Sequence, residues 1–187
     1  MRRSLRWVSL ALLVAAVPAN ASTFLHVSRG ELTARAEAVV VGTVLEVESF
    51  WSDDGRVILT EAKVLVEEAL VGEPASVVLV RTFGGTVNGF TVEAHGFPTF
   101  AKGERLLLFL EPDRRARGAH RVLGFQEGKY RVTTDKAGRD IAEPTVDAHA
   151  RLLTKDGRPA PAPRAVALET LRDEILELGR RAGRIVY

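Results

Sequence analysis

Short apolar segments with a period of two residues run through the first two thirds of the chain. In the clearest segment, Ile58, Thr60, Ala62, Val64 and Val66 alternate with mostly polar residues. Such alternation is typical of a half-buried β-strand. Seven strands are predicted in this way, at 38–47, 58–71, 76–82, 90–95, 105–110, 121–125 and 129–133. Repeated short strands at this spacing indicate a mainly β fold, an antiparallel barrel or sandwich.

Two of the expected strands are apolar on both faces rather than on one. The segments Val39–Val41 and Leu106–Leu110 contain no polar residue at all. A strand with this composition is covered on both sides. The pair Asp54-Gly55 supplies the positive backbone angles of a hairpin turn between the first two strands.

Helical patterns flank the strand-rich region. Ser28 and Glu31 have the Ser-x-x-Glu spacing of a capping box, which predicts a short helix at the start of the domain. Apolar residues at spacings of three and four predict an amphipathic helix over about 165–180. Its apolar stripe favours packing against the β-domain, and docking to a partner protein is the alternative.

The N-terminus has the three parts of a secretory signal peptide. A basic segment at 2–6 precedes an apolar run at 7–17, and Ala19-Asn20-Ala21 forms a small-residue cleavage site. The apolar run is too short to span a bilayer. We therefore expect cleavage after Ala21, export to the periplasm or the medium, and no stable membrane anchor.

The mature chain divides into three parts. We expect a β-domain at 22–155, a stiff Pro-Ala linker at 156–164, and the C-terminal helix and tail at 165–187. Within the β-domain, 135–155 is poorly defined, and its weak alternation at 145–153 is compatible with a last edge strand.

Composition excludes several classes of chemistry. The chain has 26 basic and 24 acidic residues, and loss of the signal peptide leaves 23 basic residues, so the mature protein is nearly neutral. This balance gives no support for nucleic-acid binding. The chain has no cysteine, which excludes disulfides, a cysteine nucleophile and thiolate-bound metals. An ordinary hydrophobic core must hold the domain, and we expect no cofactor.

Candidate catalytic and metal-binding residues are scattered along the chain. Glu93 and His95 would share one face of the strand at 90–95, with Asp147 or His149 as a third metal ligand. The favoured interpretation is that the histidines are isolated surface residues. No nucleophile elbow or phosphate-binding loop occurs. We expect no enzyme; the alternative is a hydrolase or metal-dependent enzyme whose residues converge only in three dimensions.

Three segments carry a likeness to a known family. They are AEAVVVGTV at 36–44, TEAKVLVEEALVG at 60–72 and GERLLLFL at 103–110, within a region of about 28–133. In this order they resemble the netrin-like modules, the OB-like barrels that include the tissue inhibitors of metalloproteinases. A closer likeness is to uncharacterised exported bacterial proteins that share the Gly-Glu-x-x-Leu-Leu-Phe-Leu segment. The resemblance implies an OB-like antiparallel β-barrel with a short N-terminal helix.

The resemblance also implies a binding module without catalysis. Its partner would be a secreted or envelope protein, and a protease is one candidate. The metalloproteinase inhibitors place the amine of a first cysteine on the protease zinc. Here the mature chain would begin Ser22-Thr23, which keeps a free amine but lacks the cysteine and its disulfide.

Two glycine-containing segments between expected strands, 83–88 and 96–100, are the candidate contact loops. Long loops between barrel strands are common ligand-binding sites. Phe97 and Phe100 are the candidate exposed anchors. The favoured interpretation is that these two rings close one end of the barrel.

Overall fold

The computed structural model describes residues 23–146 and 151–184. The expected signal peptide at 1–21 and the expected first mature residue, Ser22, lie outside the described residues. The helices are α1 (Arg29–Arg35), α2 (Leu168–Arg181) and the short 3-10 helix η1 (Phe125–Gly128). The strands are β1 (Thr23–Leu25), β2 (Ala38–Trp51), β3 (Ile58–Val71), β4 (Val77–Phe83), β5 (Gly85–Val87), β6 (Phe90–Val92), β7 (Arg105–Pro112), β8 (Ala119–Val122), β9 (Lys129–Thr134), β10 (Asp140–Pro144), β11 (Arg151–Leu153) and β12 (Val166–Ala167).

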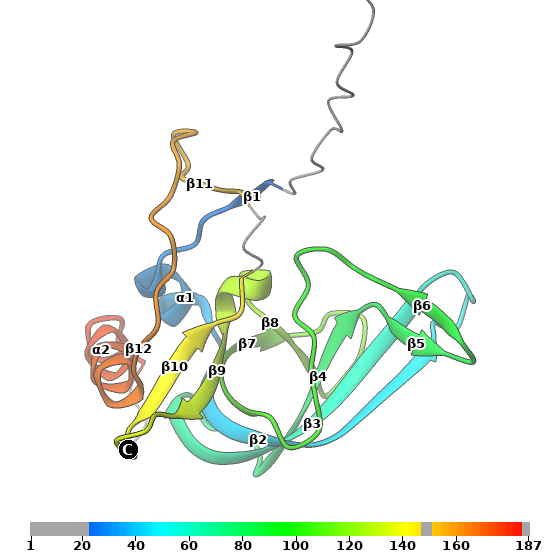
Figure 1. The fold of residues 1–187 in the computed structure, drawn as a ribbon, viewed down its shortest axis with the longest axis horizontal. Helices are drawn as coiled ribbons and strands as arrows, with labels where there is room; N and C mark the ends of the chain where they lie inside the picture. The colour runs from blue at the N-terminus through cyan, green and yellow to red at the C-terminus, as the bar shows by residue number, and fades with distance from the viewer. Residues whose placement is uncertain (1–22, 147–150, 185–187) are drawn as a thin grey trace, which may run out of the picture.

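The main sheet is mostly closed because β7 pairs with three strands, β2, β8 and β9. Its strand order is β12-β10-β9-β7-β2-β3-β4-β8. The last strand, β8, also pairs with β7 and so connects the end of the sheet back to its middle. The pairing of β4 with β8 is parallel, and the other pairings of this sheet are antiparallel. β2 and β3 form the long curved hairpin that supports the sheet (Figure 1). The mainly β fold with two helices is therefore confirmed.

Two hydrophobic clusters explain why some strands are apolar on both faces. Alternate residues of β2 and β7, such as Val40 and Leu108, belong to a cluster inside the curved sheet. Their neighbours Val39 and Phe109 belong to a second cluster that includes residues of α1 and α2. All four side chains are fully buried. The prediction that these two strands are covered on both sides is confirmed.

The two helices cover the outer face of the sheet at one end of the molecule (Figure 1). The Ser28 side chain accepts a hydrogen bond from the Glu31 amide, so half of the expected capping box caps α1. In α2, Leu168, Leu171 and Ile175 are buried in the second cluster, the one that includes Val39 and Phe109. The apolar stripe therefore packs against the β-domain, as favoured from the sequence.

Some boundaries differ from the predicted ones. The strand expected at 121–125 is β8, which ends at Val122, and Phe125 instead begins η1. The strand expected at 90–95 ends at Val92. The poorly defined segment contains β10 and β11, and the Pro-Ala linker runs beside β11, where the Ala160 amide donates to the Leu152 carbonyl. None of the helices in the described residues has the length and apolar character needed to cross a bilayer.

Candidate binding groove

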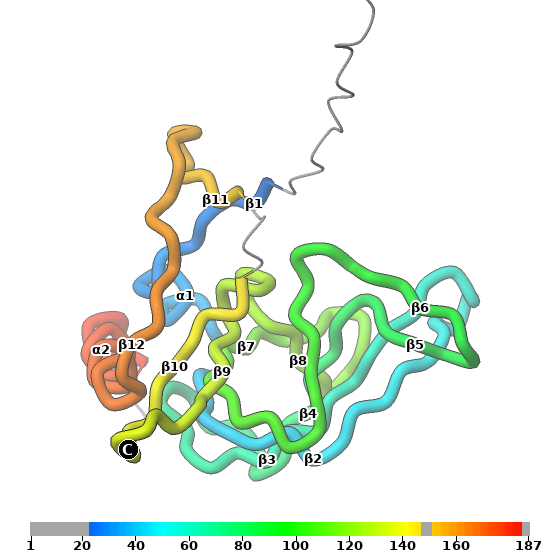
Figure 2. The backbone as a smooth tube through the Cα atoms, in the orientation of Figure 1, coloured from blue at the N-terminus to red at the C-terminus, as the bar shows by residue number. Residues whose placement is uncertain are grey.

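The described part of the chain contains a groove with a volume of about 1070 Å³. Five phenylalanine residues line it. Phe50 comes from β2, and the other four, which contact one another, come from β1, β4, the β6–β7 connection and η1: Phe24, Phe83, Phe97 and Phe125. We call it the aromatic groove. β1, η1 and the first part of the β6–β7 connection lie on the same side of the molecule (Figure 2). Residues far apart in sequence thus build one surface.

Phe97 is the centre of the ring cluster. Its ring centroid lies 5.0 Å from that of Phe83 and 5.0 Å from that of Phe125, both in edge-to-face geometry. Phe24 extends the cluster, with its centroid 6.2 Å from Phe125. Aromatic pairs favour such edge-on contacts at these separations. The four rings therefore support one another and form a continuous apolar wall.

Unusual backbone angles place two of these rings. Gly96 has φ of 84°, and a Cβ atom built there would lie 2.0 Å from the Phe24 ring, so only glycine leaves room for that ring. Phe125 has φ of 57° although it carries a side chain, and 47% of its surface is exposed. A bulky residue in the left-handed region costs about 1–3 kcal/mol. An exposed aromatic ring held at that cost is typical of a binding site.

Arginines form part of the rim of the groove. Arg81 and Arg121 are neutralised by ion pairs with Glu61 and Glu111. By contrast, the adjacent Arg114 and Arg115 are exposed, and neither side chain forms an ion pair with another described residue.

The Arg115 guanidinium instead lies 5.6 Å from the Phe83 ring centroid, in cation–π geometry. On the β2–β3 turn, Asp53 and Asp54 also line the groove. The groove thus combines an apolar wall with charges of both signs, which suits a peptide better than a purely apolar molecule.

The N-terminal segment is attached to the groove by specific contacts. β1 pairs in parallel with β11, in the register Phe24 to Leu152. Just beyond β1, the Glu127 carboxylate accepts a hydrogen bond from the Val27 amide at 3.1 Å and lies 2.5 Å from the Nδ1 atom of His26. These contacts attach the segment 23–27 to β11 and η1 without a disulfide.

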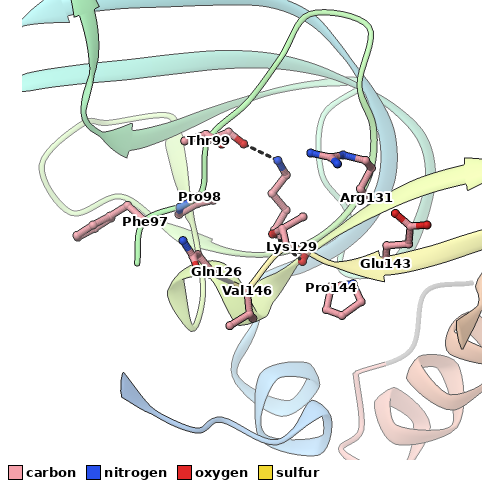
Figure 3. Close-up of a pocket in the computed structure, with 10 residues that line it drawn as sticks. Phe97, Pro98, Thr99, Gln126, Lys129, Arg131, Glu143, Pro144 and Val146 are labelled. Carbon is pink, nitrogen blue, oxygen red and sulfur yellow. Dashed lines mark hydrogen bonds between the residues drawn. The ribbon is translucent and has the colours of Figure 1, made fainter. Parts of the chain in front are cut away.

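A smaller polar pocket of about 260 Å³ shares Phe97 and Pro98 with the aromatic groove. Figure 3 shows the Lys129 side chain, from β9, pointing to the carbonyl oxygen of Thr99. Its Nζ atom also lies 3.0 Å from each carboxylate oxygen of Glu104. The Arg131 Nε atom is 3.0 Å from the same carboxylate. Glu104 therefore joins two basic residues of β9 to the end of the β6–β7 connection.

The lysine of this pocket is almost completely buried. Only 2% of the Lys129 surface is exposed, and burial lowers the pKa of its ammonium group, while the Glu104 charge partly restores it. Because Thr99 and Glu104 already accept hydrogen bonds from the ammonium, we interpret the pair as structural. It fixes the connection that carries Phe97.

The sequence-predicted contact residues occupy different positions. Phe97 lines both the groove and the pocket. Phe100 packs against the hydrophobic cluster inside the curved sheet, and its ring centroid lies 5.0 Å from the Lys129 ammonium. Thr23 is exposed in β1, and Ser22 lies outside the described residues. Of the two expected contact loops, 83–88 forms the end of β4, all of β5 and the start of the turn into β6, and 96–100 carries Phe97.

The candidate metal ligands do not converge in the described ranges. Glu93 and His95 are exposed and follow the end of β6, so they do not share a strand face as expected. Asp147 and His149 lie outside the described residues. Within 23–146 and 151–184, no three histidine, aspartate or glutamate residues are grouped in a way that suits a metal ion.

Sequence reasoning missed three phenylalanine rings of the groove, Phe24, Phe50 and Phe125. Phe24 lies just after the expected cleavage site, in a strand of only three residues that has no periodic signal. Phe125 was assigned to the end of a strand. The sequence Gly124-Phe125-Gln126-Glu127-Gly128 does carry a turn signal in its two glycines, but nothing in it predicts an exposed ring.

Comparison with known proteins gives no match, either to a protein-family model or to a curated protein. The function therefore has to be argued from the groove itself.

Proposed function

We propose that the protein is an exported, non-enzymatic binding module and that the aromatic groove holds a segment of a secreted or envelope protein. The observation that carries the proposal is the cluster around Phe97, in which an exposed ring with a strained backbone, Phe125, takes part. Interfaces concentrate their affinity in buried aromatic and arginine residues surrounded by a polar rim. The groove offers this combination.

The strand arrangement supports an OB-like assignment. β2, β3, β4, β8 and β7 follow one another around the curved sheet, and β7 pairs with β2 to complete the circuit. In OB-folds the loops between the first and second strands and between the fourth and fifth strands bind ligands. The corresponding loops here, 52–57 and 113–118, contribute residues to the aromatic groove.

Replacing Phe97 with alanine is expected to abolish capture of the partner. Loss of a central aromatic side chain typically costs at least about 2 kcal/mol of binding free energy, roughly a thirtyfold loss of affinity. Mature protein immobilised on beads would be incubated with periplasmic extract or culture medium, and the captured proteins identified by mass spectrometry. A thermal melt of each variant would establish that it is folded.

Phe90→Ala is the matched control, because Phe90 is 67% exposed in β6 and does not line the groove. It should capture the same partner as the wild type. Equal capture by the Phe97→Ala and Phe90→Ala variants would show that the groove is not the binding surface.

Protease inhibition through the mature N-terminus is the second candidate function. The observation that favours it is the attachment of β1 to β11, with further contacts from Glu127. An ordered N-terminus loses less conformational entropy when it binds a protease than a free one would. The pairing of β1, which begins at Thr23, would thus hold the N-terminus in position for the protease without a disulfide.

One extra residue before Ser22 is expected to abolish inhibition of a secreted zinc metalloproteinase, because it moves the α-amine away from the metal. One extra residue after Tyr187 is the control and should change nothing. The measurement is the inhibition constant with a fluorogenic peptide substrate. If the N-terminal extension leaves this constant unchanged, inhibition does not work through the amine.

A further inference from the structure

The chain places one of its own side chains in the aromatic groove. The Phe24 ring covers Gly96 and approaches Phe125, so it fills one end of the ring cluster. The backbone that carries this ring is an extended strand whose partner is β11. The groove therefore already contains an example of what it accepts, an extended peptide with an aromatic side chain.

The contacts of β1 are few for a permanently bound strand. Its pairing covers three residues, Thr23 and Leu25 are exposed, and Phe24 is only partly buried. Phe24 belongs to neither of the two hydrophobic clusters that form the core. Terminal segments with little buried apolar surface open locally at low free-energy cost. β1 is thus well suited to leave the groove without unfolding the domain.

We propose that β1 is an exchangeable internal ligand, and that the external partner presents an extended segment whose aromatic side chain takes the place of Phe24. This inference rests on the proposed binding function and specifies the chemistry of the partner. The partner strand pairs with β11, and its ring packs on Gly96 and Phe125. Main-chain pairing supplies affinity in such strand addition, and the side-chain subsite supplies specificity.

The geometry also implies competition. β1 is joined to α1 by three residues, 26–28, so it competes for the groove at an effective concentration on the order of millimolar. An external segment binds to the fraction of molecules in which β1 has left, and its measured affinity falls in proportion to that fraction. Weakening β1 should therefore tighten binding of a peptide added in trans.

The test uses a fluorescent peptide with the sequence of β1 and the two residues that follow it, Thr-Phe-Leu-His-Val, acetylated and amidated at its ends. Binding to the full mature chain would be measured by fluorescence anisotropy. Phe24→Ala is expected to bind this peptide at least about tenfold more tightly than the wild type. A peptide with alanine in place of phenylalanine should not bind to either protein.

Thr23→Ala is the matched control, because it alters an exposed residue of the same strand that does not line the groove. It should behave like the wild type. Failure of a folded Phe24→Ala variant to bind the peptide, or equal binding of the alanine peptide, would overturn the inference. Capture of a partner that depends on Phe97 would survive that result, so the proposed function can stand when this inference falls.

Discussion

Replacing Glu104 with glutamine is expected to lower the free energy of unfolding by about 3–5 kcal/mol, because the buried Lys129 charge then loses its counter-charge. The pair is one of the most buried in the described residues, with 2% and 9% of the two side chains exposed. The measurement is urea-induced unfolding followed by circular dichroism. Since Glu104 also ends the connection that carries Phe97, partner capture should weaken as well.

The pH dependence of this effect has a defined sign. Burial lowers the pKa of Lys129 in the folded protein below its ordinary value of 10.5. At pH values between the folded-state pKa and 10.5, the unfolded chain therefore binds more protons than the folded one. Stability therefore rises with pH in that window. Removing the Glu104 charge lowers the pKa of Lys129 further, so the Glu104→Gln variant should regain more stability than the wild type as the pH rises toward 10.5.

Two controls isolate the buried pair. Adding Lys129→Met to Glu104→Gln removes the titrating group and should remove the extra rise with pH, while also recovering much of the lost stability. Glu46→Gln breaks the exposed ion pair between Glu46 and Lys63 and should leave the unfolding midpoint almost unchanged. A Glu104→Gln variant as stable as the wild type would show that the ion pair contributes little.

The parts of the fold that were predicted correctly are those with a strong periodic signal. Alternation placed β3, and continuous apolar runs in β2 and β7 predicted cover on both faces, because these strands lie between the two hydrophobic clusters. The strands that were missed or only vaguely placed, including β1, β5 and β12, contain two to five residues. A segment that short cannot display a period, and its strand state depends on the partner it meets.

The aromatic groove was only partly predictable for a related reason. Phe97 could be selected because glycines and a proline surround it in a loop. Phe24 lies in a terminal strand and Phe125 in a strained turn, and the two residues are 101 positions apart in the chain. The His26–Glu127 contact, which spans the same separation, helps to bring these two segments together. The link between Glu104 and Lys129 was likewise hidden, although Glu104 belongs to the GERLLLFL segment that carries the family likeness.

The glycine of the AEAVVVGTV segment has a structural role that leads to the second large prediction. A Cβ atom at Gly42 would lie 2.3 Å from the carbonyl oxygen of Leu65 and 2.9 Å from a methyl group of Val64. The pairing of β2 with β3 shifts register beside Gly42, as at a β-bulge that bends a strand. Close backbone approach at this bend is therefore what the glycine permits.

Gly42→Ala is expected to destabilise the protein by about 3 kcal/mol, because a backbone oxygen cannot move aside as a flexible side chain can. Gly30→Ala is the matched control. Gly30 lies in α1, and a Cβ atom there would be in ordinary contact with Leu178 at 3.7 Å. Because alanine favours a helix over glycine, this substitution should stabilise the protein by about 0.5–1 kcal/mol. Urea-induced unfolding measures both. Equal midpoints for the two variants would rule out the close approach, and with it our explanation of how the long β2–β3 hairpin bends to bring the groove residues together.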